Sequence, residues 1–218
     1  YEGNLLTGSK VEEGSLKLNL ADGTDENFAI AMDTNAPELS EGTFYTRFTV
    51  DSITDQMLCD VKTDGTSDGS TASYIRLGFE TDPDSGRAAW FYDKASSGDG
   101  YGDFPEQSAK LVAGQENEVK LQFTKNSAGN YDLTLTVNGQ SCGTVSDVNF
   151  GESKGKFAFG SRRKGKNIEV KEVYYTNDAE YTINVTAGEN GSVSQTGNVT
   201  VFGGSSKVLF VHPKEGYE

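Results

Sequence analysis

The strongest constraint on the fold is the alternation of side chains between residues 117 and 176. Valine, leucine, threonine and aromatic residues alternate there with polar residues at period 2, and the runs break at residues 126–130 and at Asn138-Gly139. Such alternation is typical of antiparallel strands with one buried and one solvated face. An Asn-Gly pair between two such runs is a strong signal for a β-hairpin. The pattern predicts an all-β sandwich.

The rest of the chain continues in the same way. Segments rich in glycine, aspartate and serine, such as residues 64–70 and 82–86, have the composition of turns. Residues 94–110 are the longest segment without a strand or helix period, and loops of this length tend to be functional or mobile. The expected strands cover residues 15–20, 28–32, 42–51, 56–63, 73–80, 87–92, 118–124, 131–137, 140–146, 155–161 and 167–175.

The composition changes near residues 176–180, which divides the chain into a main domain at 1–176 and a smaller β unit at 177–218. Runs and turns in the smaller unit predict about three strands. The last run ends without closing its sheet, which suggests that the natural protein continues. The chain also opens at Tyr1 without a methionine or a signal-like apolar segment, as a processed piece would.

Composition excludes several classes of partner. The 218 residues are 34% hydrophobic and 24% charged, as in a globular protein, and the net charge of −14 argues against binding nucleic acid or an anionic bilayer. No apolar run approaches the roughly 18–20 residues that span a membrane, so no membrane insertion is expected.

Cys59 and Cys142 lack the paired spacing of a zinc site. They either form one disulfide, if their strands are adjacent, or are two free buried thiols.

Six segments of the main domain follow one another in a defined order: an early strand, a central aromatic hairpin, a hairpin around Val-Asn-Gly and a closing strand. They are residues 42–50, 74–79, 88–92, 133–139, 157–160 and 170–174. In this order they resemble the concanavalin A-like, or laminin-G-like (LamG), domains. The resemblance implies a two-sheet antiparallel jelly-roll sandwich, of a kind that often holds calcium and more often binds than catalyses.

Four short motifs in the smaller unit, at residues 181–186, 189–194, 203–206 and 212–217, resemble the first half of a divergent internalin-type B-repeat. Such repeats are spacers in secreted and wall-attached bacterial proteins. The resemblance therefore implies an extracellular location, secreted or attached to the cell wall, and a monomer within a larger multidomain chain.

Aromatic residues define the main candidate for a binding site. Trp90 and Tyr92 share one face of their strand, and Tyr101 follows in the long loop. Sugar rings stack on aromatic side chains, while nearby carboxylates and arginines bond their hydroxyl groups. Trp90 could equally be a core residue of the sandwich. The expected glycan-binding residues are Tyr74, Arg76, Arg87, Trp90, Tyr92, Asp99, Tyr101 and Asp103.

Two loops have the carboxylates that a calcium ion would need. Asp99 and Asp103 lie in one of them, and Asp64 and Asp68 lie in the other. Hard cations bind several oxygen ligands, so either loop is a candidate site. Asp-Gly pairs are, however, most often simple turns. No other cofactor is expected.

Basic residues concentrate between residues 154 and 171, where seven of the 19 lysines and arginines fall. Residues 161–166 are expected to form a hairpin tip. Such a tip could grip sulfate, uronate or sialate groups. Alternatively, it is a solvated turn whose lysines protect a sheet edge from aggregation. The seven are Lys154, Lys156, Arg162, Arg163, Lys164, Lys166 and Lys171.

Catalysis is not expected. Glycosidases need two carboxylates across a cleft, about 5–5.5 Å apart in retaining enzymes. The cluster at Glu80, Asp82 and Asp84 falls instead at a strand end before a proline turn, and the single histidine, His212, lies in the smaller unit. The sequence therefore predicts a non-catalytic, lectin-like module that binds a polysaccharide or glycan within a larger bacterial surface protein. The alternatives are an adhesin or structural domain that binds a host or matrix protein, and a glycoside hydrolase or polysaccharide lyase.

Overall fold

The computed structural model of the chain consists of two compact units, Tyr1–Tyr175 and Thr176–Glu218. All regular secondary structure in the described part of the chain is β-strand, so the all-β prediction is confirmed. Among the same residues, no helix is long and apolar enough to cross a membrane. The structure describes residues 10–12, 14–20, 26–31, 41–54, 57–63, 74–80, 89–95, 98–149, 156–162, 165–203 and 206–217.

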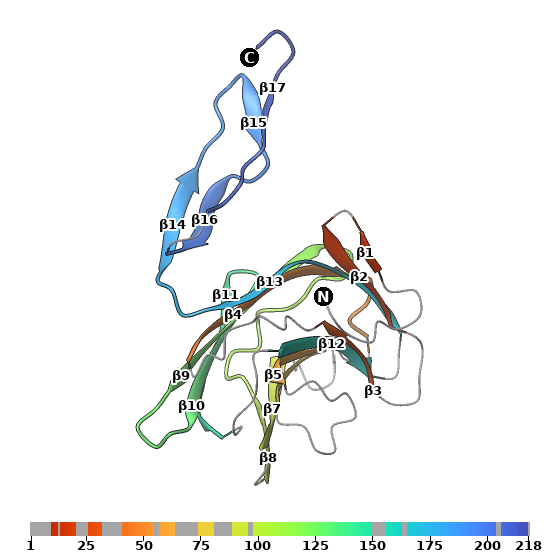
Figure 1. The fold of residues 1–218 in the computed structure, drawn as a ribbon, viewed down its shortest axis with the longest axis vertical. Coiled ribbons are helices and arrows are strands. Elements are labelled where there is room, and N and C mark those ends of the chain that lie inside the picture. Colours follow the sequence, from red (N-terminus) through yellow and green to blue (C-terminus); the bar gives the residue numbers. More distant parts are fainter. Residues whose placement is uncertain are drawn as a thin grey trace. The chain divides into compact units, whose positions relative to one another are not determined.

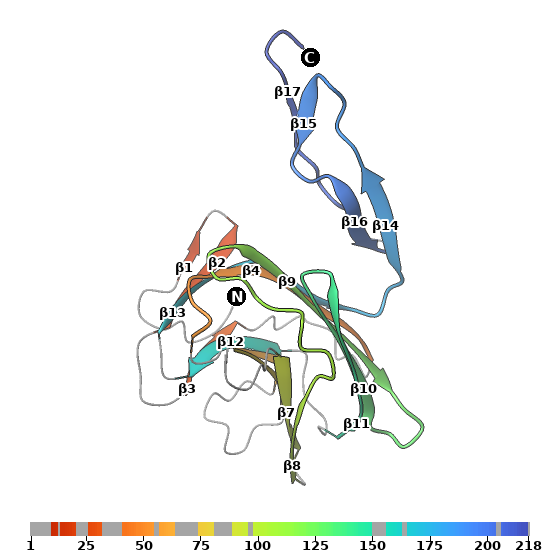
Figure 2. The ribbon, with the colours of Figure 1, turned by 180° about the vertical axis from the view of Figure 1, so that it is seen from behind.

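One layer of the first unit is a seven-stranded sheet in the order β1-β2-β13-β4-β9-β10-β11. It arches over the second layer (Figures 1 and 2). The last strand of the unit, β13, pairs in this sheet with β2, its second strand, in the register Ile168↔Leu18. The strands are β1 (Lys10–Glu12), β2 (Ser15–Leu20), β4 (Gly42–Val50), β9 (Glu116–Lys125), β10 (Tyr131–Val137), β11 (Gln140–Val148) and β13 (Lys166–Thr176).

The other layer is a six-stranded sheet in the order β3-β12-β5-β6-β7-β8. All of its neighbouring strands pair antiparallel. The two layers together form the expected two-sheet sandwich (Figure 1). The strands are β3 (Glu26–Ala31), β5 (Met57–Thr63), β6 (Tyr74–Phe79), β7 (Ala89–Ala95), β8 (Gly98–Asp103) and β12 (Lys156–Arg162).

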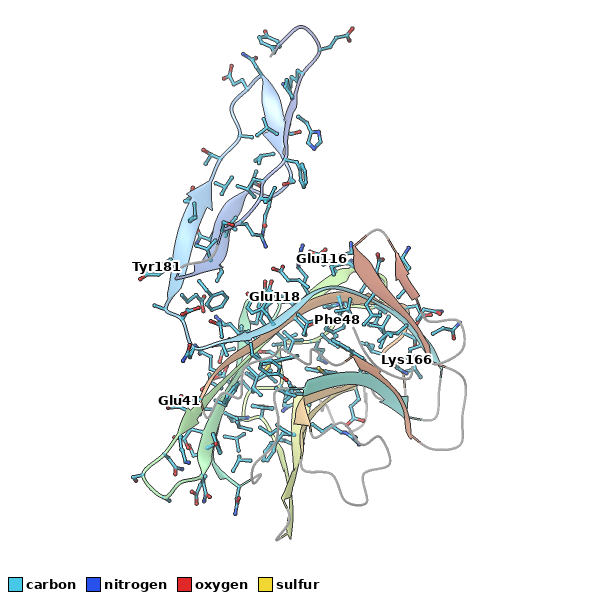
Figure 3. All side chains as sticks on the ribbon, viewed as in Figure 1. Glu41, Phe48, Glu116, Glu118, Lys166 and Tyr181 are labelled. Atoms are coloured by element: carbon cyan, nitrogen blue, oxygen red, sulfur yellow. The ribbon has the colours of Figure 1, made fainter. Side chains whose placement is uncertain are left out.

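The core lies between the two sheets and follows from the period-2 pattern. Phe48 of β4 and Phe159 of β12 are completely buried and meet edge to face, with ring centroids 5.7 Å apart. Figure 3 shows Phe48 between the sheets and Glu116 and Glu118 on the opposite side of the seven-stranded sheet. Each fully buried aromatic side chain stabilises the fold by about 1.5–3 kcal/mol relative to an exposed one.

Residues 94–110, expected to be a loop, are partly strand. β7 extends to Ala95, and β8 pairs with it in the register Tyr92↔Tyr101. Period-2 alternation is present here, but glycines at 98, 100 and 102 occupy one of its two faces. Because glycine has no side chain, a hydrophobicity pattern cannot reveal this face.

The basic segment at 161–166 is not a hairpin tip. β12 belongs to the six-stranded sheet and β13 to the seven-stranded one, so the chain crosses between layers here. Lys166 is buried, with its Nζ donating a hydrogen bond to the Thr54 carbonyl at 2.6 Å. Lys171 is exposed, and its Nζ lies 3.6 Å from Glu116 Oε2. Lys166 therefore supports the fold rather than an exposed anion-binding patch.

Both cysteines are buried free thiols, as in the second sequence alternative. Cys59 lies in β5 of one sheet and Cys142 in β11 of the other, so their strands are not adjacent. Burial, together with the nearby charge of Glu106, raises the pKa of the Cys142 thiol to about 11. The thiol therefore stays protonated and unreactive at neutral pH.

The second unit contains two sheets of two strands each, where about three strands were expected. β14 (Glu180–Val185) pairs with β16 (Gly197–Phe202), and β15 (Gly191–Val193) pairs with β17 (Val211–Pro213). Val199 and Phe202 are buried, whereas Tyr181 and Phe210 are more than half exposed.

Candidate functional site

Three of the residues expected to bind a glycan lie in one row across three neighbouring strands. Arg76 of β6 is the register partner of Tyr92 in β7, and Tyr92 is the partner of Tyr101 in β8. Adjacent strands are about 4.8 Å apart, so the row spans about 10 Å. The site depends on β8, the strand that the sequence pattern did not reveal.

Two further rows flank this one on the same face of the sheet. Tyr74 pairs with Lys94 and then Asp99, and Gly78 pairs with Trp90 and then Asp103. The positions between these rows hold Ile75, Leu77 and Phe91, which belong to the core between the sheets. We call the opposite side the β6–β8 face. Its backbone positions are those of Tyr74, Arg76, Trp90, Tyr92, Lys94, Asp99, Tyr101 and Asp103.

Trp90 was open to two interpretations, as a core residue or as a ligand platform. Its neighbours Ala89 and Phe91 are both core residues. Successive positions in a strand alternate between the two faces. The backbone position of Trp90 therefore belongs to the β6–β8 face.

Arg76 is the β6 member of the middle row of the β6–β8 face, and only 4% of its surface is exposed. Its partner on the other side, in β5, is Asp60, which extends the row by one residue. The sequence analysis did not name Asp60. The alternation within β5 could have identified it, because the flanking Cys59 and Val61 are buried in the core and Asp60 therefore belongs to the opposite face. Asp103, at the edge of the sheet, is exposed.

The calcium prediction rested on carboxylates gathered in one loop. Asp99 and Asp103 lie instead four residues apart in strand β8, which places their α-carbons about 13 Å apart. No group of three or more metal-ligating side chains occurs among the described residues. Calcium binding stays a prediction. Several other predicted residues lie outside the described part of the chain: Asp64, Asp68, Asp82, Asp84, Arg87, Lys154, Arg163 and Lys164.

The chain leaving β8 is anchored to the start of β7. The Gln107 side chain accepts a hydrogen bond from the Ala89 backbone amide at 3.0 Å and donates one to the Ala89 carbonyl at 2.8 Å. Phe104, immediately after β8, packs edge to face on Phe91 with centroids 5.9 Å apart. These contacts fix the outer edge of the β6–β8 face.

Gly102 allows β8 to approach Phe91 closely, and Gly102→Ala tests this contact. An alanine Cβ would lie 2.6 Å from Cε1 of the buried Phe91 ring. Because that ring is held by Phe104, we expect the free energy of unfolding to fall by about 1–3 kcal/mol in urea denaturation. Gly188→Ala is the control, since its Cβ would meet nothing within 4 Å. Equal stabilities of the two variants would show that the contact with Phe91 does not matter.

No family model matches the chain, and no curated protein matches it. Solved structures are similar at the level of the fold. An endo-β-1,4-glucuronan lyase from the fungus Trichoderma reesei superposes with a TM-score of 0.54 and 12% identity, over 81% of this chain and 90% of the lyase. The potassium-bound carbohydrate recognition domain of Emp46p gives 0.53 and 14%, over 78% and 86%.

A third structure, the carbohydrate-binding module CBM66 from Bacillus subtilis, gives a TM-score of 0.50 and 8% identity, over 79% of this chain and 90% of the module. This chain also corresponds to 16% of the length of a sialidase chain, with a TM-score of 0.49 and 13% identity, which is too distant to support an argument. At such identities the similarities establish a shared β-sandwich fold and nothing more.

Proposed function

We propose that the first unit is a carbohydrate-binding module and that the β6–β8 face is its binding site. The observation that carries the proposal is the single row of Arg76, Tyr92 and Tyr101 across three strands. The row combines two phenol rings, on which a sugar can stack, with a guanidinium that donates in a planar fork. Rigid strands hold these positions at fixed spacing, which suits a site that must match a repeating polymer.

Two of the similar structures are a carbohydrate recognition domain and a carbohydrate-binding module, which is consistent with this proposal. The LamG and B-repeat resemblances extend the proposal to the location of the protein and to the role of the second unit. They support a module of a secreted or wall-attached bacterial protein, with residues 177–218 as a spacer. An adhesin that binds a host or matrix protein is the alternative for a sandwich without a glycan ligand.

A polysaccharide lyase is the second candidate, and the burial of Arg76 beside two tyrosine positions favours it. A guanidinium paired with the carboxylate of a uronate acidifies the neighbouring C–H. A tyrosine would take this proton from C5 while the glycosidic C4–O bond breaks and the leaving oxygen is protonated, so that a C4–C5 double bond remains. Incubation with uronate polysaccharides distinguishes the two candidates, because only a lyase would generate an unsaturated product that absorbs in the ultraviolet.

A glycan array with the full chain tests the proposal, run once with calcium and once with a chelator. We expect Trp90→Ala and Tyr101→Ala each to weaken binding about tenfold, since one aromatic contact contributes about 0.5–1.5 kcal/mol beyond its buried area. Tyr181→Ala is the control, because Tyr181 is an exposed tyrosine in the second unit. Loss of binding with the chelator would indicate that glycan binding requires calcium.

Two results would reject the proposal. If the folded chain binds no glycan in either condition, the sandwich is better assigned to protein adhesion. If it binds a glycan and both alanine variants bind as the wild type does, the β6–β8 face is not the site.

A further inference from the structure

A groove with a volume of about 430 Å³ opens on the seven-stranded sheet, where β2, β13 and β4 lie side by side. The register pairs Lys17 with Glu169 and Asn19 with Asn167, while the alternate residues Leu18 and Ile168 are in the core. The polar side chains therefore lie on the side of this sheet that faces away from the core. We call it the β2–β13–β4 groove, and none of the described residues that line it lies on the β6–β8 face.

Backbone and side-chain hydrogen bonds hold the groove in shape. Asn167 donates from its backbone N to Asp51 Oδ1 at 2.9 Å and from Nδ2 to Asp51 Oδ2 at 2.7 Å. The Asp51 amide donates in turn to the Asn167 carbonyl at 3.1 Å, and the Gly114 amide donates to the Val50 carbonyl at 2.8 Å. Because the groove is already ordered, a ligand would bind without the loss of conformational entropy that ordering a flexible site requires.

Several hydrogen-bonding groups of the groove are still available. Within the described residues, the structure gives no partner to the Thr49 hydroxyl, the Asn167 side-chain oxygen or the Glu169 carboxylate. These groups come from two neighbouring strands, β4 and β13. Groups spaced by the roughly 4.8 Å between strands can reach successive hydroxyl groups of a sugar.

The composition of the groove limits the class of ligand. None of the described residues that line it is aromatic, so binding there has to rest on hydrogen bonds rather than on stacking. The charged residues among its described lining are Lys17, Asp51 and Glu169, with a net charge of −1 that disfavours an acidic ligand. We propose that the β2–β13–β4 groove is a second binding site, on the opposite sheet from the β6–β8 face, and that it takes neutral, polyhydroxylated carbohydrate.

The test is an NMR titration of the full ¹⁵N-labelled chain with neutral oligosaccharides (cellohexaose, xylohexaose and mannohexaose) and with an acidic one, a galacturonate hexamer. A neutral probe should shift the backbone amides of Lys17, Thr49 and Asn167 in a saturable way. The double variant Thr49→Val/Glu169→Ala removes two free groups and should weaken that binding about fivefold or more.

Gln122→Ala is the matched control, because Gln122 is exposed on β9 of the same sheet and lies outside the groove. It should leave the shifts of the groove amides unchanged, and so should Tyr101→Ala, which alters only the β6–β8 face. Groove amides that stay still with every neutral probe at millimolar concentration would overturn the second site, even if Tyr101→Ala abolishes binding elsewhere. A larger response to the galacturonate hexamer would overturn the assignment to neutral sugars.

Discussion

Replacing Phe48 with alanine is expected to lower the free energy of unfolding of the sandwich by about 3–5 kcal/mol. Phe48 is completely buried and contacts Phe159 of the opposite sheet, so the substitution leaves a cavity between the two layers. Domains of this size are stable by only about 5–15 kcal/mol. The variant should therefore unfold at a much lower urea concentration, as followed by circular dichroism.

Phe210→Ala is the control for this experiment. Phe210 is 64% exposed in the second unit, so its removal should leave the unfolding transition of the sandwich in place. Similar midpoints for the two variants would contradict the assignment of Phe48 to the core between the sheets.

Gly143→Ala should have the next largest effect, because two separate costs add at this position. Gly143 has a φ of +83°, and an alanine Cβ would lie 2.4 Å from Cγ of Pro105. The left-handed conformation costs a side-chain-bearing residue about 1–2 kcal/mol. The contact with Pro105 should bring the total loss of unfolding free energy to about 2–4 kcal/mol.

Gly139→Ala separates these two costs in the same denaturation assay. Gly139 has a φ of +74° but no atom within 4 Å of its alanine Cβ, so only the conformational cost applies. If the two variants lose the same stability, the contact with Pro105 contributes nothing. That would mean that the chain after β8 is not held against β11 there.

Strands with one buried and one solvated face were predictable, because each residue reports its own environment. β10 shows this, with Leu133, Leu135 and Val137 buried and less buried residues between them. β8 was missed because three of its six residues are glycine. The crossing between layers after β12 was also missed, since turn composition says nothing about which sheet the next strand enters.

The candidate site was predictable in its members but not in its arrangement. Alternation within one strand places Trp90 and Tyr92 on the same face. Whether Arg76 lies level with Tyr92 depends on the register between strands, which a single sequence does not contain. The β2–β13–β4 groove is even harder to predict from the sequence. Lys17 and Glu169 are about 150 residues apart along the chain and become register partners only when β2 pairs with β13.

That pairing of β2 with β13 also sets a condition on biosynthesis. The sheet position between β2 and β4 belongs to β13, the last strand of the first unit, so it stays empty while the earlier strands are translated. Leu16 and Leu18 emerge early from the ribosome, yet β13, one of the two neighbours of β2 in the sheet, is the last strand of the unit to emerge. Closing so long a loop is slow, and apolar strands exposed in the meantime are prone to aggregate. A nascent chain that stops before β13 is consequently a substrate for chaperones and proteases rather than a shorter working module.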